Sequence, residues 1–205
     1  MKYRILFITI LCLSVHALQA SQIDGIIITK KDTLHVRFVV PFTGIDFTML
    51  QRGVKYVDSL DNKCKLKPED AKEIRFEYNG QPVRMLSRYD NLSSYSDGST
   101  KIFLELIIDG PMKLFSYYVK NTAVTGSGMG GAPGASPIMM STTYEKYVLQ
   151  KGIGDLVRYG KMNFKNDMPV FVRKCPALVK LIQDKIYKRG DIEQIVSFYN
   201  ANCGN

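Results

Sequence analysis

The sequence is poor in histidine, and this scarcity limits its possible chemistry. Only His16 and His35 occur among 205 residues. His16 lies in an amino-terminal segment that we expect to be removed, which leaves His35 as the one histidine available as a base or ligand. A metal site built from several histidines is therefore excluded, and a serine–histidine–aspartate arrangement would depend on His35. Because His35 alternates with Leu34 and Val36 in an expected strand, we expect it to face solvent.

Tryptophan is absent, and long apolar runs are confined to the first twenty residues. Residues 1–20 combine Lys2 and Arg4 with an apolar core and a small residue, Ala20, which is typical of an export signal. The core is too short for a comfortable membrane span. We therefore expect cleavage after Ala20 and export to the periplasm, the outer cell surface or the medium. No transmembrane segment is expected to remain after cleavage.

Acidic residues are fewer than basic ones, although like charges do not cluster in runs. The chain has 28 lysines and arginines against 19 acidic residues, a formal net charge of +9. Their scattered placement is typical of a generally basic surface. For an exported protein we expect an envelope component as partner, whether a protein, a glycan or an anionic polymer, and we expect no nucleic acid. No cofactor is predicted.

Cysteine is also scarce, with Cys64, Cys175 and Cys203 remaining after the expected cleavage. Disulfides persist in exported proteins, and Cys175 and Cys203 share the C-terminal segment, so they are the better pair. Cys64 would then be a buried small residue. Spacing does not fix connectivity, and three unpaired cysteines remain the alternative.

Alternation of apolar and polar residues at period two predicts a mainly β protein. Residues 101–120 are expected to form a hairpin that turns at Asp109 and Gly110 and lies near the centre of a sheet. Leu34, Val36, Phe38 and Val40 should face inward from a second hairpin. Further strands are expected at residues 25–29, 33–40, 54–59, 63–66, 73–78, 81–87 and 142–150, with a possible last strand at 156–159. The spacing predicts an antiparallel meander or a partly closed, curled sheet within residues 21–165.

Two segments depart from this pattern. Residues 124–138 are rich in glycine, alanine, serine and proline, which predicts a flexible, unstructured loop, with a role as a tether or as a partner contact as the less favoured alternative. Residues 166–205 are expected to form a small helical cap that packs on the sheet, because short helices do not stand alone. The expected start signals are Asp167 to Pro169 for the first helix, Pro176 for the second, which Gly190 should end, and Asp191 with a weak capping box at Gln194 for the third. The apolar stripe of the third helix is expected to consist of Ile192, Ile195, Val196 and Tyr199.

Candidate site residues are few, and no catalytic, cofactor or metal residues are predicted. Tyr117, Tyr144 and Tyr147 could present rings to a ligand, although tyrosines packed under a helix would show the same pattern. Cys64 lies between two lysines, which could favour a thiolate nucleophile, but a buried small residue fits as well. A hydrolase using Cys64 or a serine within residues 93–99 is the least favoured reading.

Five motifs carry a resemblance that spans most of the chain after residue 20. They are GIIITKKDTLHVRF (25–38), KLKPEDAKEIRFEYNG (65–80), FLELIIDGPMKLF (103–115), CPALVKLI (175–182) and DIEQIVSFYNANC (191–203). Together they resemble a group of uncharacterised exported proteins common in Bacteroidetes. The resemblance implies export and a β-rich shape, and it implies no activity.

The leading hypothesis is a non-catalytic exported envelope protein with a binding or scaffolding role. It rests on the export signal and on the lack of a catalytic constellation in the sequence. The alternative is a lipid- or glycan-binding module that uses the interior of a curled β-sheet.

Overall fold

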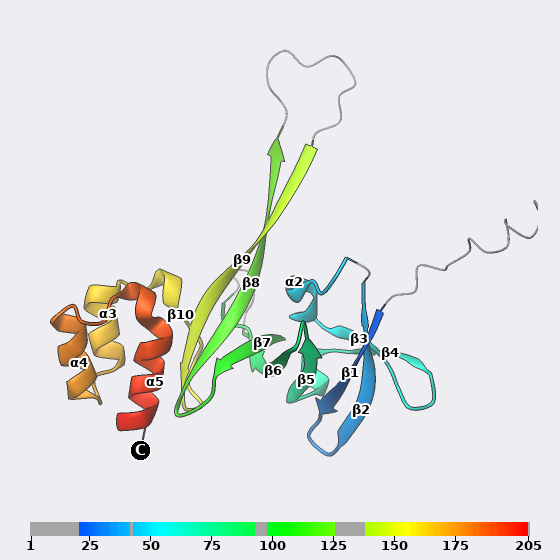
Figure 1. Ribbon diagram of the computed structural model, residues 1–205, viewed down its shortest axis with the longest axis horizontal. Coiled ribbons are helices and arrows are strands. Elements are labelled where there is room, and N and C mark those ends of the chain that lie inside the picture. Colours follow the sequence, from blue (N-terminus) through cyan, green and yellow to red (C-terminus); the bar gives the residue numbers. More distant parts are fainter. Residues whose placement is uncertain (1–20, 42, 93–97, 126–137, 205) are drawn as a thin grey trace, which may run out of the picture.

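The structure is a computed structural model that describes residues 21–41, 43–92, 98–125 and 138–204 (Figure 1). The expected export signal lies outside these ranges. So do most of the loop suggested for a nucleophilic serine and most of the glycine-rich segment.

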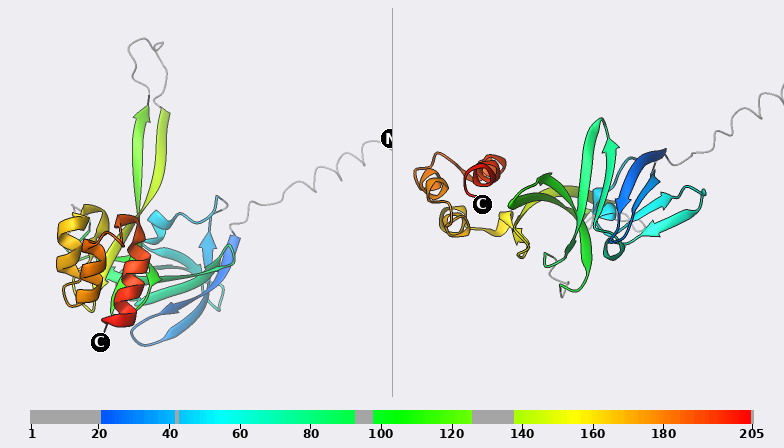
Figure 2. Two further views of the ribbon diagram at one scale, coloured as in Figure 1. Left: turned by 60° about the vertical axis from the view of Figure 1, so that its left-hand side comes forward. Right: turned by 90° about the horizontal axis from the view of Figure 1, so that it is seen from below.

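Ten antiparallel strands form one open sheet in the described part of the chain (Figures 1 and 2). Their order is β10-β9-β8-β7-β6-β5-β1-β2-β3-β4, so the sheet is a meander interrupted once, where the β1–β2 hairpin pairs with β5. The predicted fold class, a mainly β protein with an antiparallel sheet and a helical C-terminal cap, is confirmed. The strands are β1 (Ser21–Ile28), β2 (Thr33–Val40), β3 (Val54–Val57), β4 (Lys63–Leu66), β5 (Glu73–Tyr78), β6 (Gln81–Tyr89), β7 (Lys101–Ile108), β8 (Met112–Thr125), β9 (Ile138–Lys151) and β10 (Val157–Arg158).

Helices cover one face of the sheet at its two ends. We call this the inner face; it carries Phe38, Ile74, Met85 and Leu114. A single turn, α2 (Phe47–Leu50), lies over one end, and α3 (Phe164–Phe171), α4 (Pro176–Gln183) and α5 (Ile192–Asn202) lie at the other. The described ranges also contain three 3-10 turns: η1 (Pro68–Asp70), η2 (Tyr159–Lys161) and η3 (Arg189–Asp191).

The helical end is closed by a disulfide between Cys175 and Cys203, whose Cα atoms are 5.4 Å apart. This confirms the predicted pairing. The apolar stripe of α5 is fully buried against Met112, Leu114 and Leu149, as its spacing predicted. That stripe consists of Ile192, Ile195, Val196 and Tyr199.

Two of the predicted helix boundaries are wrong. The first helix begins at Phe164, because the backbone N–H of Asn163 donates to the Asp167 carboxylate over 2.7 Å and fixes the turn earlier. Pro169 therefore lies inside α3. The second helix was expected to run to Gly190, but it ends at Gln183, and Lys185 adopts a left-handed backbone conformation with φ of 61°. Ile186 consequently lies beyond the helix and is 62% exposed.

The predicted capping box of the third helix is also wrong. The Asp191 carboxylate accepts from the backbone N–H of Lys188 over 2.7 Å, so it closes η3 and makes no side-chain cap for α5. Gln194 therefore has no capping partner in Asp191.

The strands differ from expectation at two places. Leu34 is 41% exposed, because β3 pairs with β2 only at Arg37 and Phe38 and leaves the start of β2 uncovered. Strand β8 ends at Thr125 and strand β9 begins at Ile138. The glycine-rich segment outside strands is therefore shorter than predicted. Beyond Ser116, β8 no longer pairs with β7, and the β8–β9 ribbon extends past the rest of the sheet (Figure 1).

Candidate functional site

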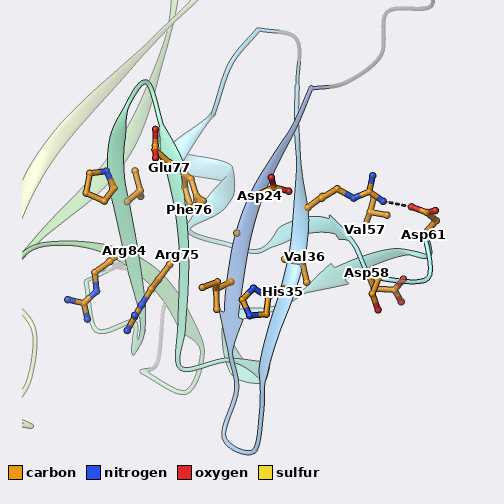
Figure 3. Close-up of a pocket in the computed structure, with 16 residues that line it drawn as sticks. Asp24, His35, Val36, Val57, Asp58, Asp61, Arg75, Phe76, Glu77 and Arg84 are labelled. Atoms are coloured by element: carbon orange, nitrogen blue, oxygen red, sulfur yellow. Dashed lines mark hydrogen bonds and ion pairs between the residues drawn. The ribbon is translucent and has the colours of Figure 1, made fainter.

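Three hollows of the described structure lie around β1–β6, at the end of the sheet away from α3–α5. The first is a depression of about 790 Å³ on the outer face, opposite the inner face defined above (Figure 3). His35, Ile26, Arg75 and Arg84 lie in cross-strand register over β2, β1, β5 and β6. This row forms the centre of what we call the arginine depression.

Glu73 holds the two arginines of this row. Its Oε1 accepts from Nε of Arg75 over 2.5 Å and from Nε of Arg84 over 2.8 Å, and its side chain is only 11% exposed. Burial raises the pKa of Glu73, but the hydrogen bonds and charges of Arg75 and Arg84 outweigh burial, so the pKa lies below its ordinary value. The carboxylate therefore stays ionised at neutral pH and keeps two like charges side by side (Figure 3).

The arginine depression is nevertheless mixed in charge. Asp24, Glu77, Asp58 and Asp61 also line it, and Asp61 forms an ion pair with Arg37. Since carboxylates and guanidinium groups alternate across it, this surface has no single sign. A simple anion would meet both attraction and repulsion here.

His35 lies on this surface, exposed as predicted, and its side chain makes no hydrogen bond to any described residue. No described side chain therefore orients its ring for proton transfer. Groups of three or more metal-binding side chains are likewise absent from the part of the chain that the structure describes.

The second hollow is a broad depression of about 1250 Å³ over the outer side of the β3–β4 hairpin. We call it the basic depression, because four cations and no carboxylate are among its lining residues: Arg37, Lys55, Lys63 and Lys65. Lys55 and Lys65 lie directly opposite each other across the hairpin. Neither they nor Lys63 lie within 4.0 Å of a carboxylate of any described residue. Like charges opposed in this way repel each other and destabilise a hairpin. Because no described carboxylate neutralises these lysines, the surface retains a positive potential.

The third hollow is an apolar cavity of about 370 Å³ on the inner face, between α2 and strands β2, β3 and β5. We call it the α2 cavity. Asp46 caps α2 by accepting from the backbone N–H of Thr48 over 2.9 Å and from the Thr48 hydroxyl, and this hydroxyl contact is the main cause of a lowered pKa at Asp46. The apolar lining consists of Ile23, Phe38, Val39, Val40, Pro41, Ile45, Met49, Leu50, Val54 and Phe76.

Gln51 fixes the far end of α2 where β7 and β8 separate. Its side-chain amide donates to the carbonyl of Tyr118 over 2.9 Å and accepts from the Tyr118 N–H over 2.6 Å. Its backbone carbonyl accepts from the N–H of Phe103 over 2.9 Å. One buried residue thus replaces the strand pairing that β7 and β8 have lost, and Phe47 adds a stacked contact with Tyr118, with ring centroids 4.8 Å apart.

The α2 cavity and the basic depression meet at a break in the sheet. Strands β2 and β3 pair at only two positions, Arg37 with Val57 and Phe38 with Tyr56, and then diverge. Val39 follows on one side of the break and Lys55 precedes on the other. Val39, Lys55 and Lys65 line both hollows, so the apolar cavity and the cationic surface adjoin there.

The three tyrosines predicted as ligand contacts are not brought together. Tyr117 and Tyr144 lie on the outer face of the β8–β9 ribbon, where Tyr117 is half-buried and Tyr144 is 49% exposed. Tyr147 lies on the inner face, and its hydroxyl donates to Glu193 of α5 over 3.2 Å. None of them lines the three hollows.

Cys64 lines the basic depression and is half-buried, with its thiol free. It lies opposite Tyr56 across the hairpin, and burial, followed by the contact with Cys64, raises the pKa of Tyr56. The lysine cluster around it was not predicted from the sequence. The alternation of Lys63 and Lys65 in one predicted strand, with Lys55 in its partner, was the signal that could have revealed it.

No protein-family model, curated protein or solved structure matches the chain. None of the helices in the described ranges combines the length and apolar character that a bilayer-spanning helix requires.

Proposed function

We propose that the protein is a non-catalytic exported binding module that holds an anionic component of the cell envelope in the basic depression. The observation that carries this proposal is the lining of that depression, in which Lys55, Lys63 and Lys65 join Arg37, which Asp61 pairs, and no carboxylate occurs among the described lining residues. The export expected from residues 1–20 supports an envelope partner.

The opposed lysines support the same proposal on energetic grounds. Two ammonium groups held across a hairpin repel each other, at roughly 0.2–1 kcal/mol for a cross-strand pair. An anion placed between Lys55 and Lys65 would relieve that repulsion and gain two charge-assisted contacts. Because the site is open to solvent, screening by salt should weaken this binding over a Debye length of about 10 Å at 0.1 M.

Binding to soluble polyanions tests the proposal. The purified protein is titrated with inorganic polyphosphate and with alginate, using neutral dextran as the uncharged control. The double variant Lys55→Ala/Lys65→Ala should weaken polyanion binding at least about tenfold, because both opposed cations are lost. The double variant Lys30→Ala/Lys31→Ala removes the same charge from the exposed β1–β2 turn and should have little effect. Equal weakening by both variants would show a diffuse basic surface and refute the site.

Assays for hydrolysis of esters, glycosides and peptides test the non-catalytic part. The variants His35→Ala and Cys64→Ser remove the histidine of the arginine depression and the free thiol of the basic depression. We expect no turnover by the wild-type protein. A robust turnover that either variant abolishes would contradict the proposal.

A further inference from the structure

We infer that the ligand is an anionic amphiphile, whose alkyl chain enters the α2 cavity through the break between β2 and β3 while Lys55 and Lys65 hold its head group. This inference rests on the proposed function for the site of the head group, and it adds a site for the alkyl chain of the ligand. It is carried by three features of the structure: the apolar lining, the shared lysines and the diverging strands.

The α2 cavity is chemically suited to hydrocarbon. Its volume of about 370 Å³ lies within the range of small-molecule sites, which is roughly 300–1,000 Å³. The one carboxylate on its wall, Asp46, is engaged by Thr48 and the backbone N–H of Met49 and lies 4.0 Å from Lys120. A glycan would need unengaged polar groups and exposed rings, so the lining favours an alkyl chain over a sugar.

The floor of the cavity depends on a close contact with a glycine. A Cβ atom at Gly25 would lie 2.3 Å from the Phe38 ring and 2.6 Å from the carbonyl oxygen of Arg75. Glycine therefore lets the Phe38 ring lie against β1 and meet Phe76 edge to face, with centroids 5.6 Å apart. A larger residue would push the ring away from β1 and toward the space that the chain would occupy.

The wall of the cavity opposite the sheet is thin. It is one helical turn, held at its C-terminal end by Gln51 and on its flank by the stacking of Phe47 on Tyr118. Met49 on this turn is 63% exposed and lines the cavity. A flexible, polarisable side chain at the rim suits a chain of variable length.

The break in the sheet connects the two parts of the ligand site. Where β2 and β3 diverge, Val39 to Pro41 line one side and Gly53 to Lys55 line the other. The apolar side chains of these segments belong to the cavity, whereas Lys55 and Lys65 also line the basic depression. A chain in the cavity would thus leave its head group beside both lysines.

Calorimetric titration with alkyl phosphates tests the inference on the wild-type protein. Chains from about eight to about fourteen carbons are used below their aggregation concentrations, and each buried methylene should tighten binding about fourfold until the cavity is full. Alkyltrimethylammonium ions of the same lengths should bind at least about tenfold more weakly, because they would meet the two lysines. Affinity independent of chain length, or equal for both head groups, would overturn the inference.

Matched variants separate this inference from the proposed function. Ile45→Trp fills the cavity from a segment outside the strands and should abolish the dependence on chain length while leaving polyphosphate binding intact. Leu34→Trp, at an exposed position outside the cavity lining, is the size-matched control. Lys63→Ala should weaken polyphosphate binding and spare alkyl phosphates, since Lys63 lines only the basic depression. If Ile45→Trp leaves the chain-length dependence unchanged, the cavity is not the site.

The two proposals can fail independently. If polyphosphate binds but the affinity for alkyl phosphates does not depend on alkyl-chain length, the proposed function stands and the inference of an amphiphilic ligand is refuted. Sedimentation with vesicles of anionic or neutral phospholipid distinguishes a lipid taken from a bilayer from a free alkyl anion. Capture by anionic vesicles that Ile45→Trp abolishes supports a bilayer source; capture that Ile45→Trp does not change, with no binding of alkyl phosphates, would refute the inference and indicate a peripheral surface contact.

Discussion

The two ends of the inner face are covered in different ways. Under α3, α4 and α5 the side chains of Met112, Leu114 and Leu149 are completely buried, and a disulfide fixes the last helix. Under α2 only one helical turn covers Phe38 and its neighbours, and a cavity of about 370 Å³ remains.

The difference separates stability from binding within one sheet. Beneath its helices the helical end is packed like a protein interior, so it can supply rigidity. The α2 end leaves its wall thin and its lining unfilled, which lowers stability and leaves room for a ligand. Substitutions at the two ends should therefore have opposite signatures, and the following predictions test this contrast.

The largest effect is expected from truncating a leucine at the helical end. Leu178→Ala in α4 removes a fully buried side chain and should lower the free energy of unfolding by about 4 kcal/mol, within the range known for such cavities. Leu50→Ala in α2 removes a half-buried side chain beside an existing cavity and should cost about 1 kcal/mol. Urea unfolding measures both, and equal losses would contradict the contrast between the two ends.

Loss of the disulfide should come next. Cys175 and Cys203 are separated by 28 positions, and opening such a loop costs about 3 kcal/mol in the chain-entropy model. The variant Cys175→Ala/Cys203→Ala should lower the melting temperature while leaving polyphosphate binding by the folded protein unchanged, because the basic depression lies at the other end of the sheet. A lost affinity in the folded variant would show that the two ends are coupled.

An intermediate effect is expected at Gln51, which connects α2 to the β8 strand. Gln51→Ala leaves the N–H and the carbonyl of Tyr118 without their side-chain partner, which should cost about 2 kcal/mol. Gln51→Glu keeps one acceptor, loses the donor and introduces a buried charge, so it should destabilise at least as much. Hydrogen exchange at the Tyr118 amide gives a local measure, and slow exchange in Gln51→Ala would contradict this bridging role.

Most of the architecture could be predicted from the sequence because the local spacing of apolar residues determines it. The turn at Asp109–Gly110, the strand at 73–78 and the stripe of α5 all follow from the spacing of apolar residues. The disulfide followed from chain proximity within one segment and from the expected compartment.

The errors arose where contacts that the apolar pattern does not record decide the outcome. Leu34 is exposed because β3 stops short of it, which no pattern within β2 records. Asp191 had the right residue type for a cap, but the backbone of Lys188 took its carboxylate. The candidate site was missed for the same reason, since the α2 cavity exists only because β2 and β3 diverge after two pairs.

The smallest expected effects compare two carboxylates near the boundary between the two ends. Glu73 has a lowered pKa, because the arginine contacts outweigh its burial. Its contribution to stability is therefore present above the pKa of the unfolded chain and is lost as the pH falls through the folded value. Glu105 has a raised pKa, mainly through burial, although Tyr118 donates to its Oε2 over 2.6 Å. Its ionised form therefore destabilises the fold at neutral pH, and this penalty disappears in acid.

The two matching substitutions should consequently shift stability in opposite directions. Near neutral pH, Glu73→Gln should lower the free energy of unfolding by about 1 kcal/mol, because a charge-assisted contact to partly exposed arginines is lost. Glu105→Gln keeps an acceptor for Tyr118, removes the buried charge and should raise stability by up to about 1 kcal/mol. Urea unfolding at about pH 7 and in acid should show both differences shrinking as the pH falls through the folded pKa values, because the wild-type carboxyls then become protonated in both states. A loss of stability in Glu105→Gln at neutral pH would mean that its carboxylate is stabilised by contacts stronger than the Tyr118 hydrogen bond. The region around Glu105 would then resemble the rigid, helical end of the sheet.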